Sequence, residues 1–198
     1  MRVFSCIMVE KQWRKRIKHV IHIFGASGAG TTELGRKIAG EMGFLHMDTD
    51  DYFWLSTDVP FTAKRPREER LVLMKKDIER AENVVLSGSL TEWGDELMPL
   101  FTLAVRVNTQ TNLRIERLKA REYARFGDRI REGGDMHRAH LEFLEWASQY
   151  DDGNEEMRSR MHHDVWQKKL SCPLLTLDGA DSLDKNIEIV KCALQKGG

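Results

Sequence analysis

Short apolar runs alternate with longer amphipathic stretches along most of the chain. Apolar residues in the stretches recur at helical spacing, as Leu34, Ile38 and Met42 do. The runs predict strands at 20–25, 44–48, 83–87, 102–107 and 173–178. The stretches predict helices at 31–42, 68–81, 110–125, 136–151, 155–170 and 182–194, with an aromatic-rich loop at 51–67.

Strands that alternate with helices indicate parallel pairing through right-handed crossovers. The strands are apolar nearly throughout, which is typical of a sheet buried on both faces. The sequence therefore predicts a three-layer α/β fold. Ligands bind such sheets at the carboxyl ends of the strands, so the residues after each strand are the candidates for chemistry.

The composition narrows this picture to one folded domain. The chain has 198 residues, of which 41% are hydrophobic and 31% charged, and only four prolines, so long disorder is not expected. Lys+Arg and Asp+Glu both number 31, which argues against broad nucleic-acid binding. We expect a basic extension at 1–19 and the folded domain at 20–198.

The location of the protein is predicted from what the sequence lacks. It shows no apolar stretch near the length of a membrane span and no signal-peptide pattern at its start. The cysteines, which are Cys6, Cys172 and Cys192, are too few and too scattered for a disulfide framework. We therefore expect a cytoplasmic protein without a membrane partner.

A glycine-rich segment follows the first expected strand and precedes the first expected helix. It matches seven of the eight positions of the phosphate-binding pattern G-x-x-x-x-G-K-[ST], in which backbone N–H groups surround an anion at a helix N-terminus. Thr32 stands where a hydroxyl binds Mg²⁺, and Thr31 replaces the usual lysine. We expect nucleotide phosphates to bind this segment, which comprises Gly25, Ala26, Ser27, Gly28, Ala29, Gly30, Thr31 and Thr32.

The segment GASGAGTTELGRKIAGEMG, followed by the acidic strand end DTD, resembles P-loop small-molecule kinases of the nucleoside-monophosphate kinase type. Adenylate, cytidylate, shikimate and gluconate kinases belong to this group, in which threonine also occurs in place of the lysine. The resemblance covers most of residues 20–194. It implies a P-loop fold with five parallel strands and a central first strand. It also implies ATP, Mg²⁺ and phosphoryl transfer to a small molecule.

Acidic residues end the second expected strand, in the sequence HMDTDD. Side chains alternate along a strand, so Asp48 and Asp50 are expected to face the same side. In similar kinases one carboxylate of such a pair supports Mg²⁺ and the other accepts the proton of the acceptor hydroxyl. The resemblance thus implies a metal-side role for Asp48 and a catalytic role for Asp50. Asp51 competes for the acceptor role, because Asp51, Tyr52 and Phe53 resemble the D-D-F-Y of nucleoside kinases.

Arginines gather on one face of the helix expected at 110–125. A stripe of like charges favours an anionic partner, and this one comprises Arg114, Arg117, Arg121 and Arg125. It resembles the R-x-x-R-L-x-x-R that leads into the lid of these kinases, expected here at about 122–135. The resemblance implies that Arg117 and Arg121 are catalytic and replace the charge missing at Thr31. Pairing of the stripe with neighbouring acids such as Glu122 is the alternative.

Further candidates lie near the ends of other expected strands. Arg65 is a candidate for holding an anionic substrate, and Ser87 is expected to line the acceptor cleft. The resemblance implies that the turn at Gly179 contacts adenine. Trp146 and Tyr150, by contrast, predict the core face of a helix.

Two other functions stay open at this point. A nucleotide-binding regulator that transfers nothing is favoured by the missing lysine. An RNA-associated NTPase would use the basic segment at 13–18. The acceptor of a kinase also stays open among a nucleoside monophosphate, a nucleoside, a sugar acid and a cyclic polyol, and the sequence predicts no oligomeric state.

Overall fold

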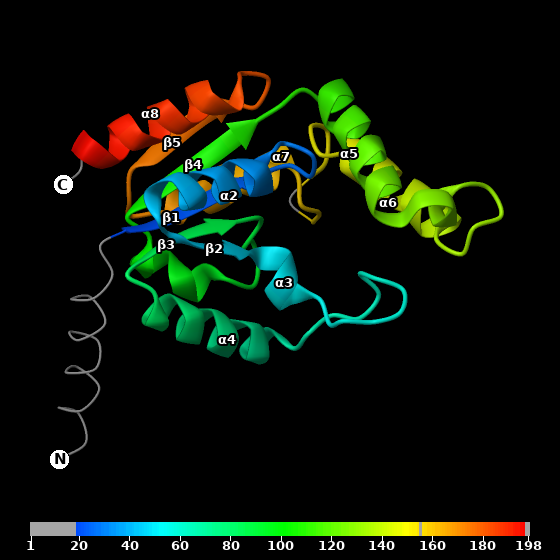
Figure 1. Ribbon diagram of the computed structural model, residues 1–198, viewed down its shortest axis with the longest axis horizontal. Coiled ribbons are helices and arrows are strands. Elements are labelled where there is room, and N and C mark those ends of the chain that lie inside the picture. Colours follow the sequence, from blue (N-terminus) through cyan, green and yellow to red (C-terminus); the bar gives the residue numbers. More distant parts are fainter. Residues whose placement is uncertain (1–18, 155, 197–198) are drawn as a thin grey trace, which may run out of the picture.

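Figure 1 shows the computed structural model of the protein, which describes residues 19–154 and 156–196. Its five strands are all parallel and lie in the order β2-β3-β1-β4-β5. They are β1 (His19–Gly25), β2 (Leu45–Asp48), β3 (Asn83–Ser87), β4 (Leu103–Asn108) and β5 (Leu174–Asp178). The predicted parallel α/β sheet with a central first strand is therefore confirmed. The expected extension at 1–19 lies outside the described residues except for His19, which begins β1.

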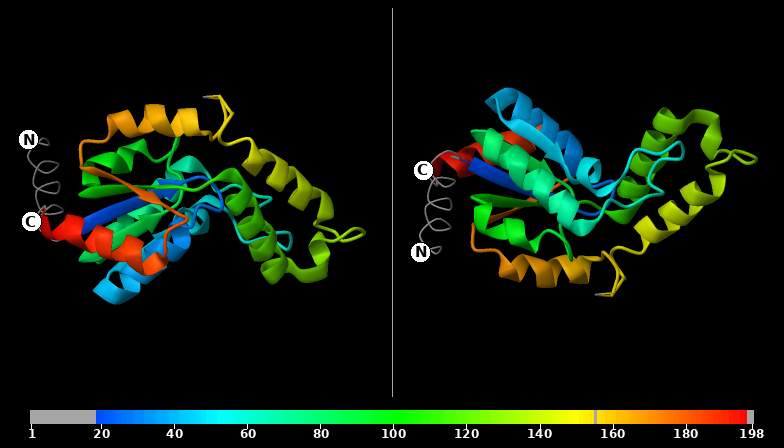
Figure 2. Two further views of the ribbon diagram at one scale, coloured as in Figure 1. Left: turned by 90° about the horizontal axis from the view of Figure 1, so that it is seen from above. Right: turned by 90° about the horizontal axis from the view of Figure 1, so that it is seen from below.

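Helices cover both faces of the sheet (Figure 2). One face carries α2 (Thr31–Met42) and α8 (Leu183–Lys196). The other carries α4 (Arg67–Arg80), the 3₁₀ helix η1 (Asp95–Leu100) and α7 (Arg160–Trp166), which η3 (Gln167–Lys169) extends. Alternate residues of β1 serve the two layers, because Ile21 and Ile23 pack toward α2 whereas Val20 and Phe24 pack toward α4 and α7. This two-sided burial explains why the strands are apolar nearly throughout.

A pair of helices, here called the arm (residues 111–148), extends beyond the carboxyl ends of the strands (Figures 1 and 2). It consists of α5 (Thr111–Phe126), the 3₁₀ turn η2 (Gly127–Ile130) and α6 (His137–Ser148). The expected lid at 122–135 forms the far end of this arm. Because β4 leads directly into α5, the arm stands beside the sheet edge where ligands bind in such folds.

The expected elements differ from the structure by more than two residues in three places, and η1 forms where the sequence predicts no element. The expected aromatic-rich loop begins inside a short helix, α3 (Thr49–Phe53), because the Asp48 side chain caps its first turn. The helix expected at 136–151 already ends at Ser148. The helix expected at 155–170 is wrong over its first part, because α7 begins only at Arg160, where Ser159 provides the N-cap.

Membrane spans are not found in the part of the chain that the structure describes, where every helix is too short or too polar for that role.

Candidate functional site

The glycine-rich segment forms a tight loop between β1 and α2, from Gly25 to Thr31. Gly28 and Gly30 both have positive φ, of 80° and 98°, which side-chain-bearing residues rarely adopt. A Cβ atom at Gly28 would lie 2.6 Å from the Arg114 carbonyl oxygen, so the loop packs directly against α5. Gly30 faces open space apart from the Arg117 guanidinium, 3.8 Å from where its Cβ would lie. The loop therefore presents backbone, at a helix N-terminus, to any anion above it.

Asp48 connects the end of β2 to this loop. Its Oδ2 accepts a hydrogen bond from the Thr32 hydroxyl at 3.0 Å, and its Oδ1 accepts one from the Asp50 backbone N–H at 3.1 Å. The chain turns into α3 at Thr49, so the alternation argument that paired Asp48 with Asp50 on one strand is wrong. Their proximity comes instead from the capping contact at the start of α3.

The Thr32 and Asp48 oxygens fit a magnesium ion that nucleotide phosphates help to hold. Mg²⁺ prefers oxygen ligands and is bound in kinases through one or two carboxylates and the substrate phosphates. Within 19–154 and 156–196, no group of three or more His, Cys, Asp or Glu side chains is arranged as a metal site. The donors present are thus suited to a nucleotide-dependent ion rather than to a site made by protein alone.

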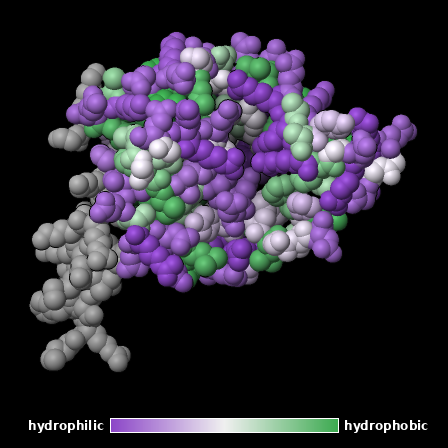
Figure 3. Space-filling model, in the orientation of Figure 1, coloured by the Kyte–Doolittle hydropathy of each residue, from purple (hydrophilic) through white to green (hydrophobic). Residues whose placement is uncertain are grey.

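A pocket of about 650 Å³ lies beside the loop, between the arm and the segment after α3. That segment folds back on itself through an antiparallel pairing of Trp54 with Lys64, and its Phe61 ring touches the Phe126 ring at the end of α5 (centroids 6.4 Å apart). Figure 3 shows hydrophilic side chains around the hollow between sheet and arm. The glycine-rich loop contributes Ser27 to the pocket wall, so the loop and the pocket are continuous.

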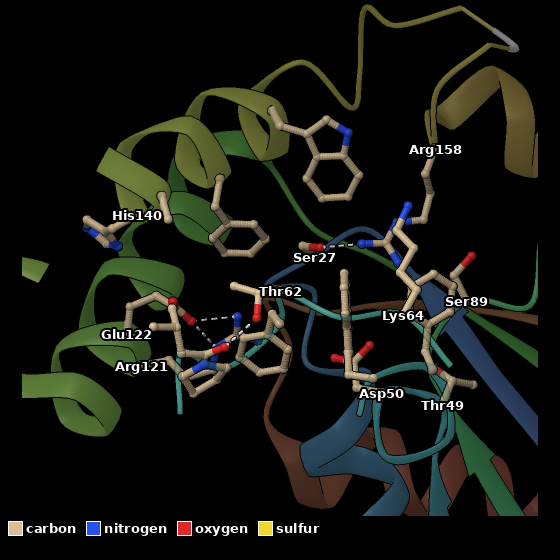
Figure 4. Close-up of a pocket in the computed structure, with 18 of the residues that line it drawn as sticks. Ser27, Thr49, Asp50, Thr62, Lys64, Ser89, Arg121, Glu122, His140 and Arg158 are labelled. Carbon is tan, nitrogen blue, oxygen red and sulfur yellow. Dashed lines mark hydrogen bonds and ion pairs between the residues drawn. The ribbon is translucent and has the colours of Figure 1, made fainter. Parts of the chain in front are cut away.

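Aromatic and charged side chains are prominent in the pocket lining, beside smaller polar and aliphatic ones (Figure 4). The aromatic side chains are Phe53, Trp54, Trp93 and Phe61 on one side and Phe143 and Trp146 of α6 on the other. The charged ones are Asp50, Lys64, Glu92, Arg121, Glu122, Arg125, Glu156 and Arg158. The expectation that Trp146 faces the core is therefore wrong, whereas Tyr150 is buried.

The carboxylates after β2 lie in different surroundings. Asp50 lines the pocket, where its side chain is exposed to solvent. Loss of hydration between the pocket walls and the neighbouring Asp48 raise its pKa, while Arg158 and Arg121 oppose that rise. Asp51 follows it on α3 but is not among the residues that line the pocket. Of the two candidates for the acceptor role, only Asp50 therefore faces the cavity.

The arginines of α5 differ from the expected stripe of free charges. Arg114 is fully buried and bonds the Ala147 and Thr109 carbonyl oxygens and the Asp151 carboxylate, so it holds the base of the arm. Arg121 pairs with Glu122 at 3.0 Å, as the alternative interpretation proposes. The idea of an unpaired stripe is therefore wrong for these two positions.

Arg117 reaches the other side of the loop. Its Nη2 donates to the Gly179 carbonyl oxygen at 2.9 Å, and its Nη1 lies near Gly30. Gly179 itself is close to the loop, since a Cβ there would lie 2.7 Å from the Ala29 carbonyl oxygen. Arg117 and Gly179 thus lie together over the loop, on the side that leads away from the pocket.

The arginines at the end of the arm are occupied within the arm itself. Arg129 pairs with Asp135 at 2.7 Å, and Arg131 contacts Asp128 at 2.9 Å and the Tyr123 hydroxyl at 2.7 Å. Neither arginine lines the pocket. The missing lysine charge is therefore not supplied from the end of the arm in this arrangement.

Two further candidates lie outside the pocket. Arg65 donates to the Tyr52 carbonyl oxygen at 3.0 Å and to Glu69 at 2.8 Å, which fastens the start of α4 to α3. Ser87 is fully buried and bonds His46 Nε2 at 2.9 Å beneath α2. The pocket takes Ser89 instead, two residues further along.

Sequence reasoning missed Arg158, which precedes α7. Its Nη2 donates to the Ser27 hydroxyl at 2.8 Å, so it reaches the glycine-rich loop from a segment 131 residues away. The segment is expected as helix from the sequence, and no local pattern distinguishes this arginine from its neighbours. Only the path of the chain back from the arm brings it to the loop.

The fold is that of P-loop kinases. Shikimate kinase from Acinetobacter baumannii is 16% identical with a TM-score of 0.52, over 92% of this chain and 97% of that one. A gluconokinase from Sinorhizobium meliloti 1021 is 18% identical with a TM-score of 0.51, over 91% and 94% of the two chains. Shikimate kinase from Aquifex aeolicus is 12% identical with a TM-score of 0.51, over 89% and 96%. These likenesses define the class of fold.

Sequence similarity identifies the family within that class. The "Uncharacterized protein YqaC" of Bacillus subtilis (strain 168) is 40% identical over 174 residues, which are 88% of this chain and 96% of that protein. The chain belongs to the YqaC family. No family model matches it.

Proposed function

We propose that the protein transfers the γ-phosphoryl group of ATP to a small-molecule acceptor. One observation carries the proposal: the Ser27 side chain of the loop and the Asp50 carboxylate line the same pocket. A donor phosphate on the loop and an acceptor hydroxyl in the pocket would meet between these residues. The P-loop kinase fold supports the same reaction class.

Each part of the site has a role in this proposal. Backbone N–H groups of the loop bind the β-phosphate, and Thr32 and Asp48 hold Mg²⁺, which neutralises phosphate charge when bound. Asp50 orients the acceptor hydroxyl and takes its proton. Arg117 contacts the nucleotide next to the Gly179 turn, and Arg121 faces the transferred group from the arm.

The pocket walls favour one kind of acceptor. Aromatic rings on both sides suit a flat ring that stacks or packs between them. The guanidinium groups of Arg121 and Arg125 suit a negatively charged group. We therefore propose an acceptor that carries both features, such as a nucleotide, rather than an uncharged polyol.

An ADP-release screen over a panel of nucleoside monophosphates, nucleosides, sugar acids and polyols tests this function. Wild-type protein with Mg²⁺ and ATP should release ADP well above background with members of one class, and mass spectrometry should show the phosphorylated product. Asp50→Asn protein serves as the matched blank. The proposal of phosphoryl transfer would be contradicted if the rate of ADP release did not depend on any acceptor and was the same in wild-type and Asp50→Asn protein.

A nucleotide-binding regulator is the second candidate, and Thr31 is the observation in its favour. It predicts tight ATP binding by calorimetry and no acceptor-dependent ADP release with any class in the panel. The RNA-associated NTPase depends on residues 13–18, which lie outside the described residues. Binding to RNA that falls steeply with salt would favour that function.

A further inference from the structure

The glycine-rich loop carries Thr31 where the usual motif has a lysine, so a cation from elsewhere in the chain has to supply that charge to a bound phosphate. In the described ranges, two arginine side chains reach the loop. Arg117 approaches Gly30 from the side of the Gly179 turn, away from the pocket. Arg158 approaches Ser27 on the pocket side, where the transferred phosphoryl group would travel.

The Arg158 side chain has a defined position but makes few hydrogen bonds. It makes one side-chain hydrogen bond within the described residues, to the neutral Ser27 hydroxyl, although a guanidinium offers five N–H donors. No carboxylate oxygen of 19–154 or 156–196 pairs with it within 4 Å. Its guanidinium carbon instead lies 4.8 Å from the centre of the Trp146 ring. Arg158 is half-buried, and none of its nitrogens is both buried and without a hydrogen-bond partner, so its unbonded N–H groups face the pocket. The charge of Asp50 acts on it across the pocket without forming an ion pair, which leaves these donors available to an anion.

Arg114 shows what a structural arginine looks like in the same protein. Arg114 is fully buried, whereas Arg158 is half-buried, and the donors of Arg114 are met by two backbone carbonyl oxygens, the Thr111 hydroxyl and the Asp151 carboxylate. The N–H donors of Arg158 are not satisfied in this way, because only one of them has a hydrogen-bond partner among the described residues. Arg114 therefore stabilises the fold, whereas most N–H donors of Arg158 remain available to a ligand.

The backbone around Arg158 fixes its direction. The Ser159 hydroxyl bonds the Asn154 carbonyl oxygen, and the Arg160 N–H donates to the Tyr150 carbonyl oxygen at 2.7 Å. Arg160 also pairs with Asp151 at 2.6 Å. The residues that follow Arg158 are therefore bonded to residues 150–154, just after the arm, and the Arg158 side chain points across the pocket toward Ser27 (Figure 4).

We propose that Arg158 supplies the positive charge that the loop lacks at Thr31, by donating to the γ-phosphoryl group of bound ATP. The assignment deepens the proposed function and rests on it. An acceptor oxygen forms a bond to the γ-phosphorus, and the bond from that phosphorus to the bridging oxygen breaks. The bonding electrons leave with ADP, and the acceptor proton passes to Asp50. Negative charge gathers on the transferred oxygens, between Ser27 and Asp50, where Arg158 lies.

The first test measures nucleotide binding without any acceptor. Calorimetry with ADP and with the non-hydrolysable analogue AMP-PNP, both with Mg²⁺, compares wild type and Arg158→Ala. We expect AMP-PNP affinity to fall about 10- to 100-fold, as for a lost charge-assisted hydrogen bond, and ADP affinity to change less than about threefold. Arg138→Ala, which removes an exposed arginine of α6, should change neither.

A second variant separates charge from folding. Arg158→Ala combined with Thr31→Lys restores the lysine of the usual motif, and should recover most of the lost AMP-PNP affinity. Equal losses for ADP and AMP-PNP, no loss for either, or no recovery by Thr31→Lys would each overturn the assignment. If wild type shows this γ-phosphate dependence but no transfer to any acceptor, the proposed function fails while the assignment of Arg158 stands.

Discussion

The two halves of the site are built in different ways. The proposed nucleotide side is one continuous stretch, from Gly25 to Thr32, whose backbone N–H groups would bind phosphate between a strand and a helix. The acceptor side is assembled from side chains of α3, the segment after it, both helices of the arm and the segment before α7. The first half is fixed by local spacing, whereas the second depends on how distant segments fold together. Variants that affect only one half test whether the two are independent.

The largest expected effect is that of Asp50→Asn, which should affect the proposed acceptor side and leave the nucleotide side intact. Asp50→Asn should lower turnover about 10²- to 10⁴-fold, because the acceptor proton loses its base, while ATP affinity stays nearly unchanged. Calorimetry with and without Mg²⁺, beside a transfer assay, measures both. Asp51→Asn should keep most activity, since Asp51 lies outside the pocket. The reverse pattern would mean that the nucleoside-kinase-like alignment of these carboxylates is correct.

A substitution on the nucleotide side should have the next largest effect. Gly30→Val places a side chain at φ 98° in the space above the loop, and should weaken ATP binding about 100-fold or more through lost backbone hydrogen bonds to phosphate. Gly43→Val is the matched control, because Gly43 has φ 68°, has open space around it and ends α2 far from the loop. Both variants should lose similar thermal stability, and only the first should lose nucleotide. Tight ATP binding by folded Gly30→Val would contradict this placement of the nucleotide.

The acceptor side alone should respond to Phe143→Ala. Removing this ring from the pocket wall should raise the KM of the acceptor about tenfold through lost ring contacts and leave ATP affinity unchanged. Leu141→Ala is the control on the same helix, since Leu141 is 51% exposed and does not line the pocket. Steady-state kinetics with the acceptor found in the screen measures the difference. An unchanged KM would argue against acceptor binding between the rings.

The same contrast explains what the sequence could predict. All five strands lie within one residue of their predicted limits, and α2 matches its prediction, because burial and helical periodicity are local properties. The loop is predictable for the same reason. Arg158 and the pocket role of Trp146 are not, since a helix pattern gives the same residues whether they face a core or a cavity. The pairing of Arg114 with Asp151 likewise depends on tertiary contacts alone.

A buried histidine lies next to each half of the proposed site, His22 in β1 and His163 in α7. Substituting these histidines should give the smallest of the predicted effects, a change in how stability depends on pH. The strand β1, which contains His22, leads into the glycine-rich loop, and the His22 ring stacks on those of Phe24 and Phe101. His163 in α7 bonds the Tyr150 hydroxyl at 2.8 Å and lies near Ser89 of the pocket wall. Burial lowers the pKa of each histidine to about 3.

Stability should therefore depend on pH through both histidines. An unfolded histidine has a pKa of about 6.5, so below that pH the unfolded chain binds protons that the folded one excludes. The free energy of unfolding should be unaffected by these groups above about pH 7 and fall as the pH drops toward 3, by about 1.4 kcal/mol per pH unit for each histidine. His22→Phe should remove one such proton from the slope and cost little stability at pH 8. It deletes Nε2, which lacks a partner among the described residues, and loses only the long contact of Nδ1 with the Leu86 carbonyl oxygen at 3.3 Å. His163→Phe should flatten the slope equally but cost about 1–3 kcal/mol at every pH, because the buried Tyr150 hydroxyl loses its hydrogen-bond partner on His163. Urea unfolding of wild type and both variants between pH 5 and pH 8 measures these slopes, and parallel slopes in all three proteins would show that the histidines are not the groups responsible.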